Sequence, residues 1–259
     1  MIFPALLRRL HELTEIDYER IGLRGNPAYS ELRRGPELHV HVKRGKLEDE
    51  LIDLIEGFLS GEEVKHAYLF SREGGAGKSH TQNVLRRYCE ERDIPFIDML
   101  HEDIGSDLRR SVPYLLGLIG AERVIIFLEC DFPNRVYREL VELPRCLIIG
   151  SGHNPWEELR GVIDLFKVYD LERDYPMTSE QLYELLRLTM EELRIGGDEV
   201  IRDVLLRAIA ERTRLPGEAL NLLGILLAIK AWKAKEGEDY ELTEWDIEIW
   251  SQRGMRFIG

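Results

Sequence analysis

Apolar residues between positions 47 and 171 alternate between helical spacing and short continuous runs. Positions three and four apart predict amphipathic helices over residues 47–59 and 78–92. The continuous runs predict buried strands over residues 66–71, 95–99, 123–128, 145–149 and 168–171. Strands without polar alternation need helices on both faces, which is the pattern of a parallel sheet. We therefore expect an α/β fold with a three-layer core.

The pattern on either side of this core is helical. After Pro176, apolar residues predict a small α-helical bundle with helices over residues 182–193, 200–209, 217–235 and 244–250. Before the core, residues 1–19 predict an amphipathic helix and residues 22–36 a loop rich in glycine and proline. The expected division is an N-terminal arm over residues 1–45, an α/β core over 46–175 and a helical domain over 176–259.

Charge limits the partners that the chain can bind. Its 259 residues hold 35 Lys and Arg against 48 Asp and Glu, a net charge of −13, which opposes general adhesion to nucleic-acid phosphates. Residues 1–46 are the exception, with nine basic and six acidic side chains. The basic residues are Arg8, Arg9, Arg20, Arg24, Arg33, Arg34, Lys43, Arg44 and Lys46. We expect at most a weak, salt-sensitive contact with DNA through this arm, and the alternative is an ordinary solvated face.

The remaining composition points to a cytoplasmic protein. Cys89, Cys130 and Cys146 are too few and too scattered for a disulfide framework or a paired zinc site. No apolar run reaches the roughly 18 residues of a membrane span, and the start becomes charged too early for a secretory signal. Three Gln and five Asn beside abundant Glu and Arg are typical of heat-adapted proteins.

A glycine-rich segment, SREGGAGKSHT over residues 71–81, lies between a predicted strand and a predicted helix. Its glycines let successive backbone N–H groups turn toward an anion, Lys78 can reach terminal phosphates, and the Ser79 hydroxyl can bind Mg²⁺. The residues expected to bind nucleotide are Gly74, Gly75, Ala76, Gly77, Lys78, Ser79 and His80. The strict phosphate-loop pattern has glycine where this chain has Arg72, and the alternative is an ordinary glycine turn.

Polar side chains follow two of the other predicted strands. RVIIFLECD, over residues 123–131, ends with Glu129 and Asp131. Hydrolysis of a nucleoside triphosphate needs a carboxylate beside the phosphates, so Glu129 is a candidate for orienting water, and both residues are candidates for holding Mg²⁺. The other interpretation is solvated acidic residues at a strand end. After the next strand, the Asn154 amide can either contact a γ-phosphate or form a turn before Pro155.

Together, residues 47–250 resemble the AAA+ ATPases, most nearly the replication initiators and helicase loaders. EGGAGKSH resembles the family's Walker A loop, RVIIFLECD its Walker B strand and CLIIGSGHN its first sensor. The resemblance implies a P-loop core that binds ATP or ADP with Mg²⁺, with Lys78 and Glu129 as catalytic residues and Asn154 as the sensor. It also implies a helical lid and assembly with further copies or other subunits. Arg160 is a candidate for an arginine finger that acts on a neighbouring subunit, or else an ordinary surface arginine.

Three positions depart from the family pattern. Arg72 replaces the first loop glycine, Leu128 stands where the family has a Mg²⁺-binding aspartate, and Gly217 stands at the place of the second-sensor arginine. Nucleotide binding is therefore a firmer expectation than hydrolysis. The leading hypothesis is a slow ATPase that serves as a nucleotide-dependent switch in DNA replication, recombination or a related process. The alternatives are a phosphate-loop scaffold or interaction subunit without hydrolysis and, less favoured, a small-molecule kinase.

Overall fold

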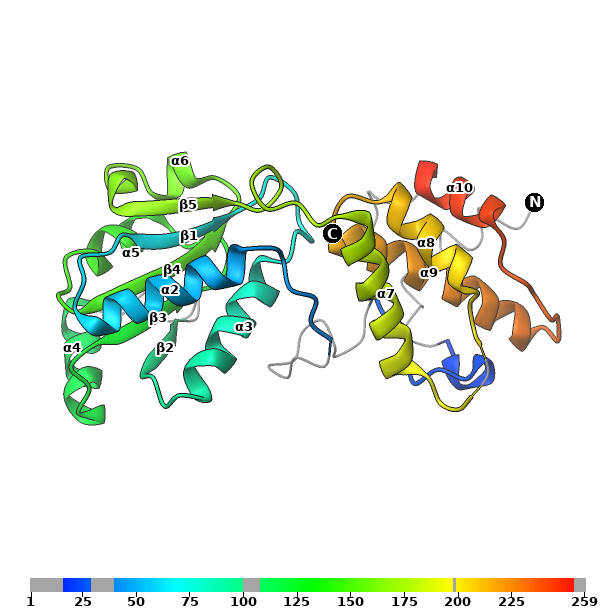
Figure 1. Ribbon diagram of the computed structural model, residues 1–259, viewed down its shortest axis with the longest axis horizontal. Helices are drawn as coiled ribbons and strands as arrows, with labels where there is room; N and C mark the ends of the chain where they lie inside the picture. The colour runs from blue at the N-terminus through cyan, green and yellow to red at the C-terminus, as the bar shows by residue number, and fades with distance from the viewer. Residues whose placement is uncertain (1–15, 29–39, 100–107, 198, 254–259) are drawn as a thin grey trace. The chain divides into compact units, whose positions relative to one another are not determined.

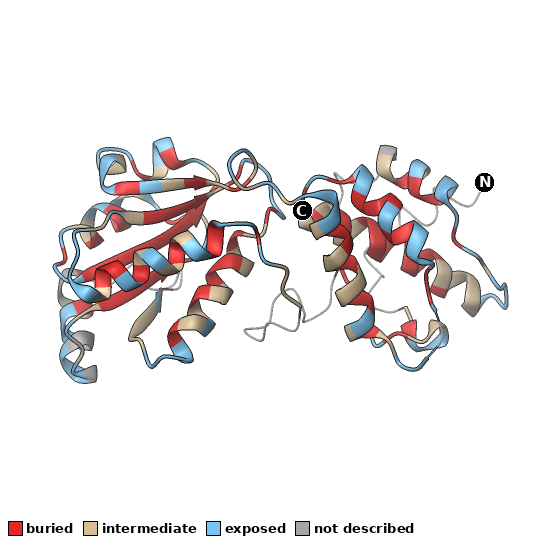
Figure 2. Cartoon of the chain, in the orientation of Figure 1, coloured by how far each residue is buried: buried red, intermediate tan, exposed pale blue. Residues whose placement is uncertain are grey.

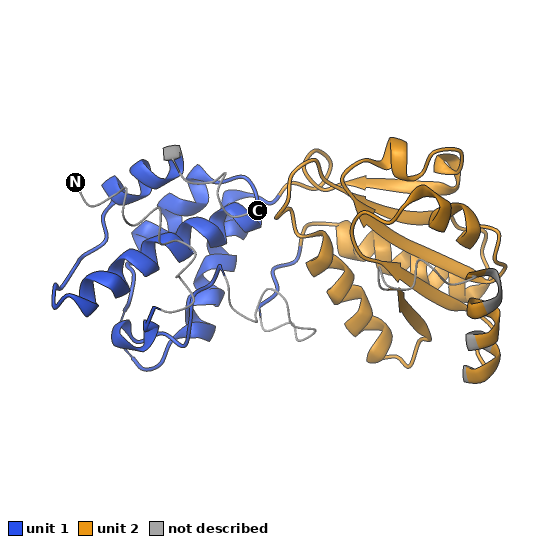
Figure 3. Ribbon diagram, turned by 180° about the vertical axis from the view of Figure 1, so that it is seen from behind, with its two compact units in different colours: residues 1–43, 177–259 blue, residues 44–176 orange. Residues whose placement is uncertain are grey.

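The chain folds into two compact units (Figure 3). The computed structural model describes residues 16–28, 40–99, 108–197 and 199–253. One unit is the α/β unit, residues 44–176, and the other is the helical unit, which combines residues 1–43 with 177–259. The chain therefore crosses between the units twice, after Lys43 and after Pro176. From the sequence we expected residues 1–45 to form a separate arm, whereas this division groups residues 1–43 with the C-terminal helices.

The α/β unit contains a five-stranded sheet in which every pairing is parallel. Strand β1 (His66–Phe70) lies between β4 (Cys146–Gly152) and the edge strand β5 (Phe166–Asp170). Beyond β4 follow β3 (Val124–Leu128) and the edge strand β2 (Phe96–Met99). All five predicted strands are confirmed, with ends shifted by up to three residues. The order β2-β3-β4-β1-β5 places the loops after β3, β4 and β1 side by side at one edge of the sheet.

Helices cover both faces of this sheet (Figure 1). The helices of the unit are α2 (Leu47–Ser60), α3 (Lys78–Glu90), α4 (Leu108–Ile119), α5 (Asn134–Leu140) and the short α6 (Pro155–Glu158), followed by a 3₁₀ turn, η5 (Ile163–Leu165). Figure 1 shows α2 and α3 in front of the sheet, while α4 and α5 pack on the opposite face around Tyr68, Ile126 and Ile148. The sequence pattern predicted α2 and α3 but not α4, α5 or α6.

Burial follows the predicted periodicity. On α2, Leu47, Leu51 and Ile55 are fully buried, and the helix ends at Gly61, whose left-handed φ of +95° suits glycine. Strands β3 and β4 carry unbroken runs of buried residues (Figure 2). The inner strands therefore form the core of the α/β unit, while the edge strands β2 and β5 expose Asp98 and Lys167.

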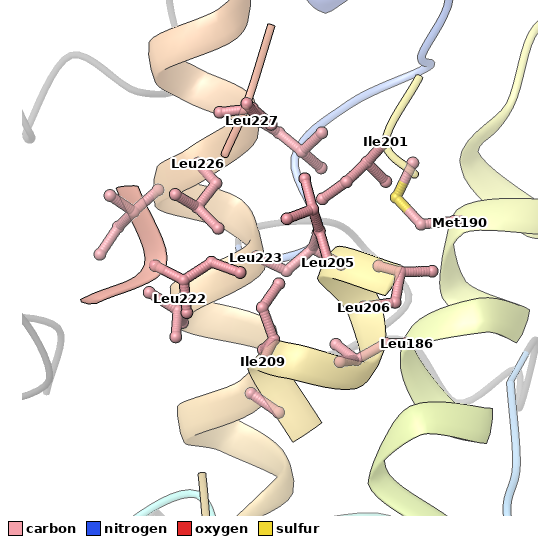
Figure 4. Close-up of a cluster of buried hydrophobic side chains, with 14 of the residues drawn as sticks. Leu186, Met190, Ile201, Leu205, Leu206, Ile209, Leu222, Leu223, Leu226 and Leu227 are labelled. Carbon is pink, nitrogen blue, oxygen red and sulfur yellow. The ribbon is translucent and has the colours of Figure 1, made fainter. Parts of the chain in front are cut away.

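The helical unit has a leucine-rich core of its own (Figure 4). Its helices are α7 (Ser179–Leu193), α8 (Asp203–Arg212), α9 (Pro216–Lys235) and α10 (Glu244–Arg253). The four predicted helices are confirmed, with ends shifted by up to three residues. Thr178 and Gln181 form a capping box at the start of α7. Among the described helices, none combines the length and the hydrophobicity needed to span a lipid bilayer.

The described N-terminal residues pack onto this helical core. A 3₁₀ turn, η2 (Tyr18–Ile21), leads to Leu23, which is fully buried and bridges to Arg194. The Asn26 amide donates to the Gly224 carbonyl in α9 at 2.9 Å. The predicted helix over residues 1–19 lies almost entirely outside the described residues.

His66, at the start of β1, is a half-buried neutral histidine. Its Nδ1 accepts a hydrogen bond from the Ile148 N–H at 3.2 Å, and its ring lies 5.1 Å from that of Phe166. Burial lowers the pKa of His66 to about 4. Protonation would also break the hydrogen bond, because a protonated Nδ1 has no lone pair to accept it.

This histidine should make the protein less stable in mild acid. The unfolded chain binds a proton near pH 6.5 and the folded chain near pH 4, so stability is lost as the pH falls from 6.5 to 4. Between pH 7 and pH 5 the loss amounts to about 2 kcal/mol. His66→Asn keeps an acceptor but cannot titrate, so urea denaturation at the two pH values should show a loss smaller by that amount. An unchanged pH dependence in His66→Asn would contradict this assignment.

Candidate functional site

The glycine-rich loop connects β1 to α3 at the edge where the strands end. Gly75 and Gly77 have φ values of +81° and +93°, which glycine adopts without steric cost, and Gly77 directly precedes α3. A Cβ on Gly74 would have open space around it. Arg72, which stands where the strict phosphate-loop pattern has its first glycine, is exposed. The loop thus bends around the N-terminal end of α3, where free backbone N–H groups and the helix dipole attract anions.

Lys78, the first residue of α3, is buried at this end of the helix. Its Nζ donates to the Ser71 hydroxyl at 2.6 Å, and that hydroxyl donates to the Glu73 carbonyl at 2.8 Å. Nζ also lies 3.4 Å from both ring nitrogens of His153, which follows β4. Burial lowers the pKa of Lys78, against the opposing effects of Cys130 and Asp131. An ammonium group is therefore held where the loops after β1, β3 and β4 meet.

His153 bridges the loops after β1 and β4. Its Nδ1 lies 2.9 Å from the Ser71 carbonyl. Because a carbonyl oxygen only accepts hydrogen bonds, Nδ1 carries the proton and Nε2 is left to accept from Lys78. The sequence pattern pointed to Asn154 as the polar residue of this loop and to His153 as a turn neighbour. In the structure, Asn154 is exposed and caps α6, with its Oδ1 accepting from the Glu157 N–H at 3.3 Å.

A partly buried hydrogen-bond cluster fixes the turn that carries His153. The Glu158 carboxylate accepts from the Tyr68 hydroxyl at 2.5 Å and from the backbone N–H groups of His153 and Asn154 at 3.2 and 2.8 Å. Burial raises the pKa of Tyr68, so this hydroxyl stays a donor at neutral pH. At Gly152 an added Cβ would lie 2.2 Å from both the Tyr68 hydroxyl and the Glu158 carboxylate. The turn therefore has room for glycine alone at that position.

The two predicted carboxylates, Glu129 and Asp131, are both exposed at the end of β3. The backbone there is held by Ser151 of β4, whose Oγ accepts from the Cys130 N–H at 3.0 Å and whose carbonyl accepts from the Asp131 N–H at 3.2 Å. Asp131 has a φ of +63°, a conformation that such cross-strand bonds must hold in place. Both side chains thus face solvent at the edge that carries Lys78.

Gln82 is a positioning residue that the sequence pattern did not single out. It is fully buried on α3, and its Nε2 donates to the Leu128 carbonyl at 3.0 Å and to the Ile149 carbonyl at 2.9 Å. The amide therefore links the helix that follows the loop to the ends of β3 and β4. A glutamine within an amphipathic helix carries no signal for this role, because its partners are backbone atoms of distant strands.

No protein-family model and no curated protein matches the sequence. Solved structures do match. Orc1 of Aeropyrum pernix, in complex with DNA, has a TM-score of 0.55 at 18% identity, covering 86% of this chain and 69% of that chain. The RuvB Holliday junction branch migration motor of Thermotoga maritima has a TM-score of 0.52 at 17% identity, covering 84% of this chain and 78% of that chain. Katanin, in a structure concerned with its self-assembly, has a TM-score of 0.56 at 18% identity, covering 84% of each.

The chain has the AAA+ P-loop ATPase fold. The segment that resembles Walker A follows β1, whereas those that resemble Walker B and the first sensor contain β3 and β4. These three strands are neighbours in the sheet. At identities of 17–18%, the likeness is one of fold.

The donor set at this edge of the sheet fits a nucleotide with Mg²⁺. Leu128 is fully buried in the sheet, so carboxylates at the end of β3 come from Glu129 and Asp131. Among the described residues, no three His, Cys, Asp or Glu side chains gather to hold a metal by themselves. Mg²⁺ accepts phosphate and water oxygens beside one or two protein ligands, so Ser79 and these carboxylates are candidates to hold it. Ser79 and His80 are half-buried in the first turn of α3, and Arg160 is exposed after α6.

Substitution of Gly152 tests the turn that carries His153. Gly152→Ala should lower the free energy of unfolding by about 1–3 kcal/mol, because the new Cβ forces apart the Tyr68–Glu158 pair. Gly74→Ala is the matched control, since its Cβ meets open space, and its effect should stay within about 0.5 kcal/mol. Urea denaturation of both variants makes the comparison, and equal stabilities would be inconsistent with this packing.

Proposed function

We propose that the protein is a cytoplasmic ATPase that binds ATP with Mg²⁺, hydrolyses it slowly and uses its nucleotide state as a switch in DNA replication, recombination or a related process. The observation that carries the proposal is the buried ammonium of Lys78, which directly follows a glycine-rich loop in an AAA+ P-loop fold. Burying an ammonium group that contacts a hydroxyl and an imidazole but, among the described residues, no carboxylate lowers stability, so such a group is typical of a binding site.

The proposed roles follow from the positions of the side chains. Backbone N–H groups of residues 74–79 and the Lys78 ammonium bind the phosphates, and Ser79, Glu129 and Asp131 hold Mg²⁺. Bound Mg²⁺ neutralises charge on the phosphate oxygens. Glu129, exposed at the strand end, orients the attacking water. His153, beside Lys78, is the better placed residue to sense the terminal phosphate, and Asn154 remains the second candidate.

Assembly and the helical unit complete the proposed switch. The exposed Arg160 would act in trans on the site of a neighbouring subunit, as part of a homo- or hetero-oligomer. Nucleotide state would be transmitted to the helical unit, which serves as the lid. Among the solved structures that this chain resembles, Orc1 is bound to DNA, RuvB is a branch migration motor and katanin self-assembles. These likenesses support an assembly that acts on DNA.

The proposal includes only a weak direct contact with DNA through the N-terminal basic residues. Arg8, Arg9, Arg33 and Arg34 lie outside the described residues. Arg44 is buried and Arg20 pairs with Asp17 at 2.9 Å, whereas Arg24, Lys43 and Lys46 are exposed. Among the described residues of this set, Arg44 alone is withdrawn from the surface.

A second candidate function is a nucleotide-binding scaffold without hydrolysis. The observation that favours it is the fully buried Leu128 at the position where the resembled family has a Mg²⁺-binding aspartate. Loss of that carboxylate weakens stabilisation of the transition state more than binding of the ground state.

Phosphate release separates the two candidate functions. The wild type should hydrolyse ATP slowly, Lys78→Ala should lose at least tenfold in ATP affinity, and Glu129→Gln should bind ATP but lose turnover. Glu122→Gln, an exposed glutamate before the opposite end of β3, is the matched control and should behave like the wild type. Binding without turnover in the wild type would support the scaffold, and no ATP binding at all would contradict both.

Calorimetry with Mg·ATP and Mg·ADP compares the two candidate sensors. His153→Ala removes a side chain that contacts Lys78 and should weaken ATP binding about tenfold, or about 1.4 kcal/mol, with a smaller effect on ADP. Asn154→Ala removes the cap of α6 and should change affinity less than threefold. The reverse order of effects would return the sensor role to Asn154.

A further inference from the structure

Arg44 is a buried arginine whose guanidinium contacts the backbone of the phosphate loop. Its side chain donates to three backbone carbonyls, those of Ala76, Leu171 and Tyr175. The bond from Nη2 to Leu171 measures 2.8 Å. Ala76 lies inside the glycine-rich loop, whereas the other two acceptors lie in the turn that follows β5. One side chain thus joins the loop to a segment almost a hundred residues away.

The turn over residues 170–175 leads directly to a crossing between the units. Asp170 closes it, because its carbonyl accepts from the Asp174 N–H at 2.9 Å and its carboxylate from the Arg173 N–H at 3.0 Å. Tyr175 lies two residues before Met177, where the helical unit resumes, and Arg44 is itself the first residue after the other crossing. The guanidinium therefore ties the phosphate loop to both points at which the chain leaves the α/β unit.

Further contacts hold this arrangement in place. Both Glu48 carboxylate oxygens accept from the Arg44 N–H at 3.0 Å, which fixes its backbone to the first turn of α2. The Tyr175 hydroxyl donates to Glu50 of the same helix at 2.8 Å. A second link joins loop and turn, since Glu172 Oε1 accepts from the Glu73 N–H at 3.0 Å.

The geometry requires arginine. A guanidinium presents five N–H donors in a rigid plane, so it can reach acceptors on separate segments, whereas a lysine ammonium offers its donors from one atom. Burial lowers the pKa of Arg44 to about 10, so the group is still charged at neutral pH. A buried cation without these carbonyls would be strongly unfavourable. The phosphate loop and the turn after β5 are therefore held together around the Arg44 guanidinium.

We propose that Arg44 is a positioning residue that couples the shape of the phosphate loop to the turn over residues 170–175, and so to the passage of the chain into the helical unit. The inference rests on the proposed function for its ligand, because nucleotide is what would change the shape of the loop. Arg44 itself donates to backbone and contacts no nucleotide in this role.

Hydrogen exchange of the full chain without nucleotide tests the link itself. Arg44→Met and Arg44→Lys should both speed exchange about tenfold over residues 171–176, because the carbonyls of that turn lose their shared donor. Arg173→Met is the matched control, since Arg173 belongs to the same turn but is exposed and pairs with Asp174 at 2.8 Å. If Arg44→Met does not fold, Arg44→Lys decides the outcome. Exchange equal to that of the wild type in the folded variants would overturn the proposal.

Adding Mg·ATP tests the coupling. In the wild type, exchange should slow both over residues 72–79 and over 171–176, whereas in Arg44→Lys the loop should respond and the turn should not. Lys78→Ala should abolish both responses and leave the nucleotide-free turn as in the wild type. A turn that responds equally in Arg44→Lys would overturn the coupling. A wild type that responds nowhere would instead reject the proposed function, and the nucleotide-free comparison would still decide whether the link exists.

Discussion

A buried ammonium group needs acceptors, and the parallel order of the sheet supplies them to Lys78. Because β1 lies beside β4, the loop after β1 and the turn after β4 reach the same point, where Ser71 and His153 meet the lysine. In another strand order, His153 would lie apart and the charge would keep only the Ser71 hydroxyl of its own loop. The pairing of β1 with β4 therefore supplies the second polar partner of this buried lysine.

Single polar side chains then hold the strand ends in place, two of them buried and the third partly buried. Gln82 joins the carbonyls of Leu128 and Ile149, Ser151 holds the backbone after β3, and Glu158 holds the turn after β4. Each of them uses backbone groups that strand pairing leaves unpaired at the edge of a sheet, where an unsatisfied buried group would be costly. The site is therefore rigid in its frame, while the exposed carboxylates of β3 remain free to meet a ligand.

Local sequence patterns predict the strands, most helices and the glycine-rich loop of this protein better than they predict which side chains meet at the site. The apolar runs predicted the strands and the glycine spacing predicted the loop, because both depend on neighbouring residues. The helix α5 was missed since its seven residues, with Val136, Tyr137 and Leu140 buried, are too few to show a period. His153 was passed over because β4 continues to Gly152 through pairing with Phe70, which places the first loop residue later than the apolar run indicates. The contacts of Arg44 bridge distant segments, and no local pattern records them.

The two buried cations, Lys78 and Arg44, differ in what can replace their partners. Both are 5% exposed. Lys78 contacts a hydroxyl and an imidazole, which a phosphate can outcompete, because a charged acceptor forms the stronger hydrogen bond. Arg44 contacts backbone carbonyls, and displacing them would leave those carbonyls unpaired in the interior. The chemistry of the acceptors thus makes Lys78 available to a ligand and binds Arg44 to the fold, so that a change at the loop reaches the turn through Arg44 without loss of its contacts.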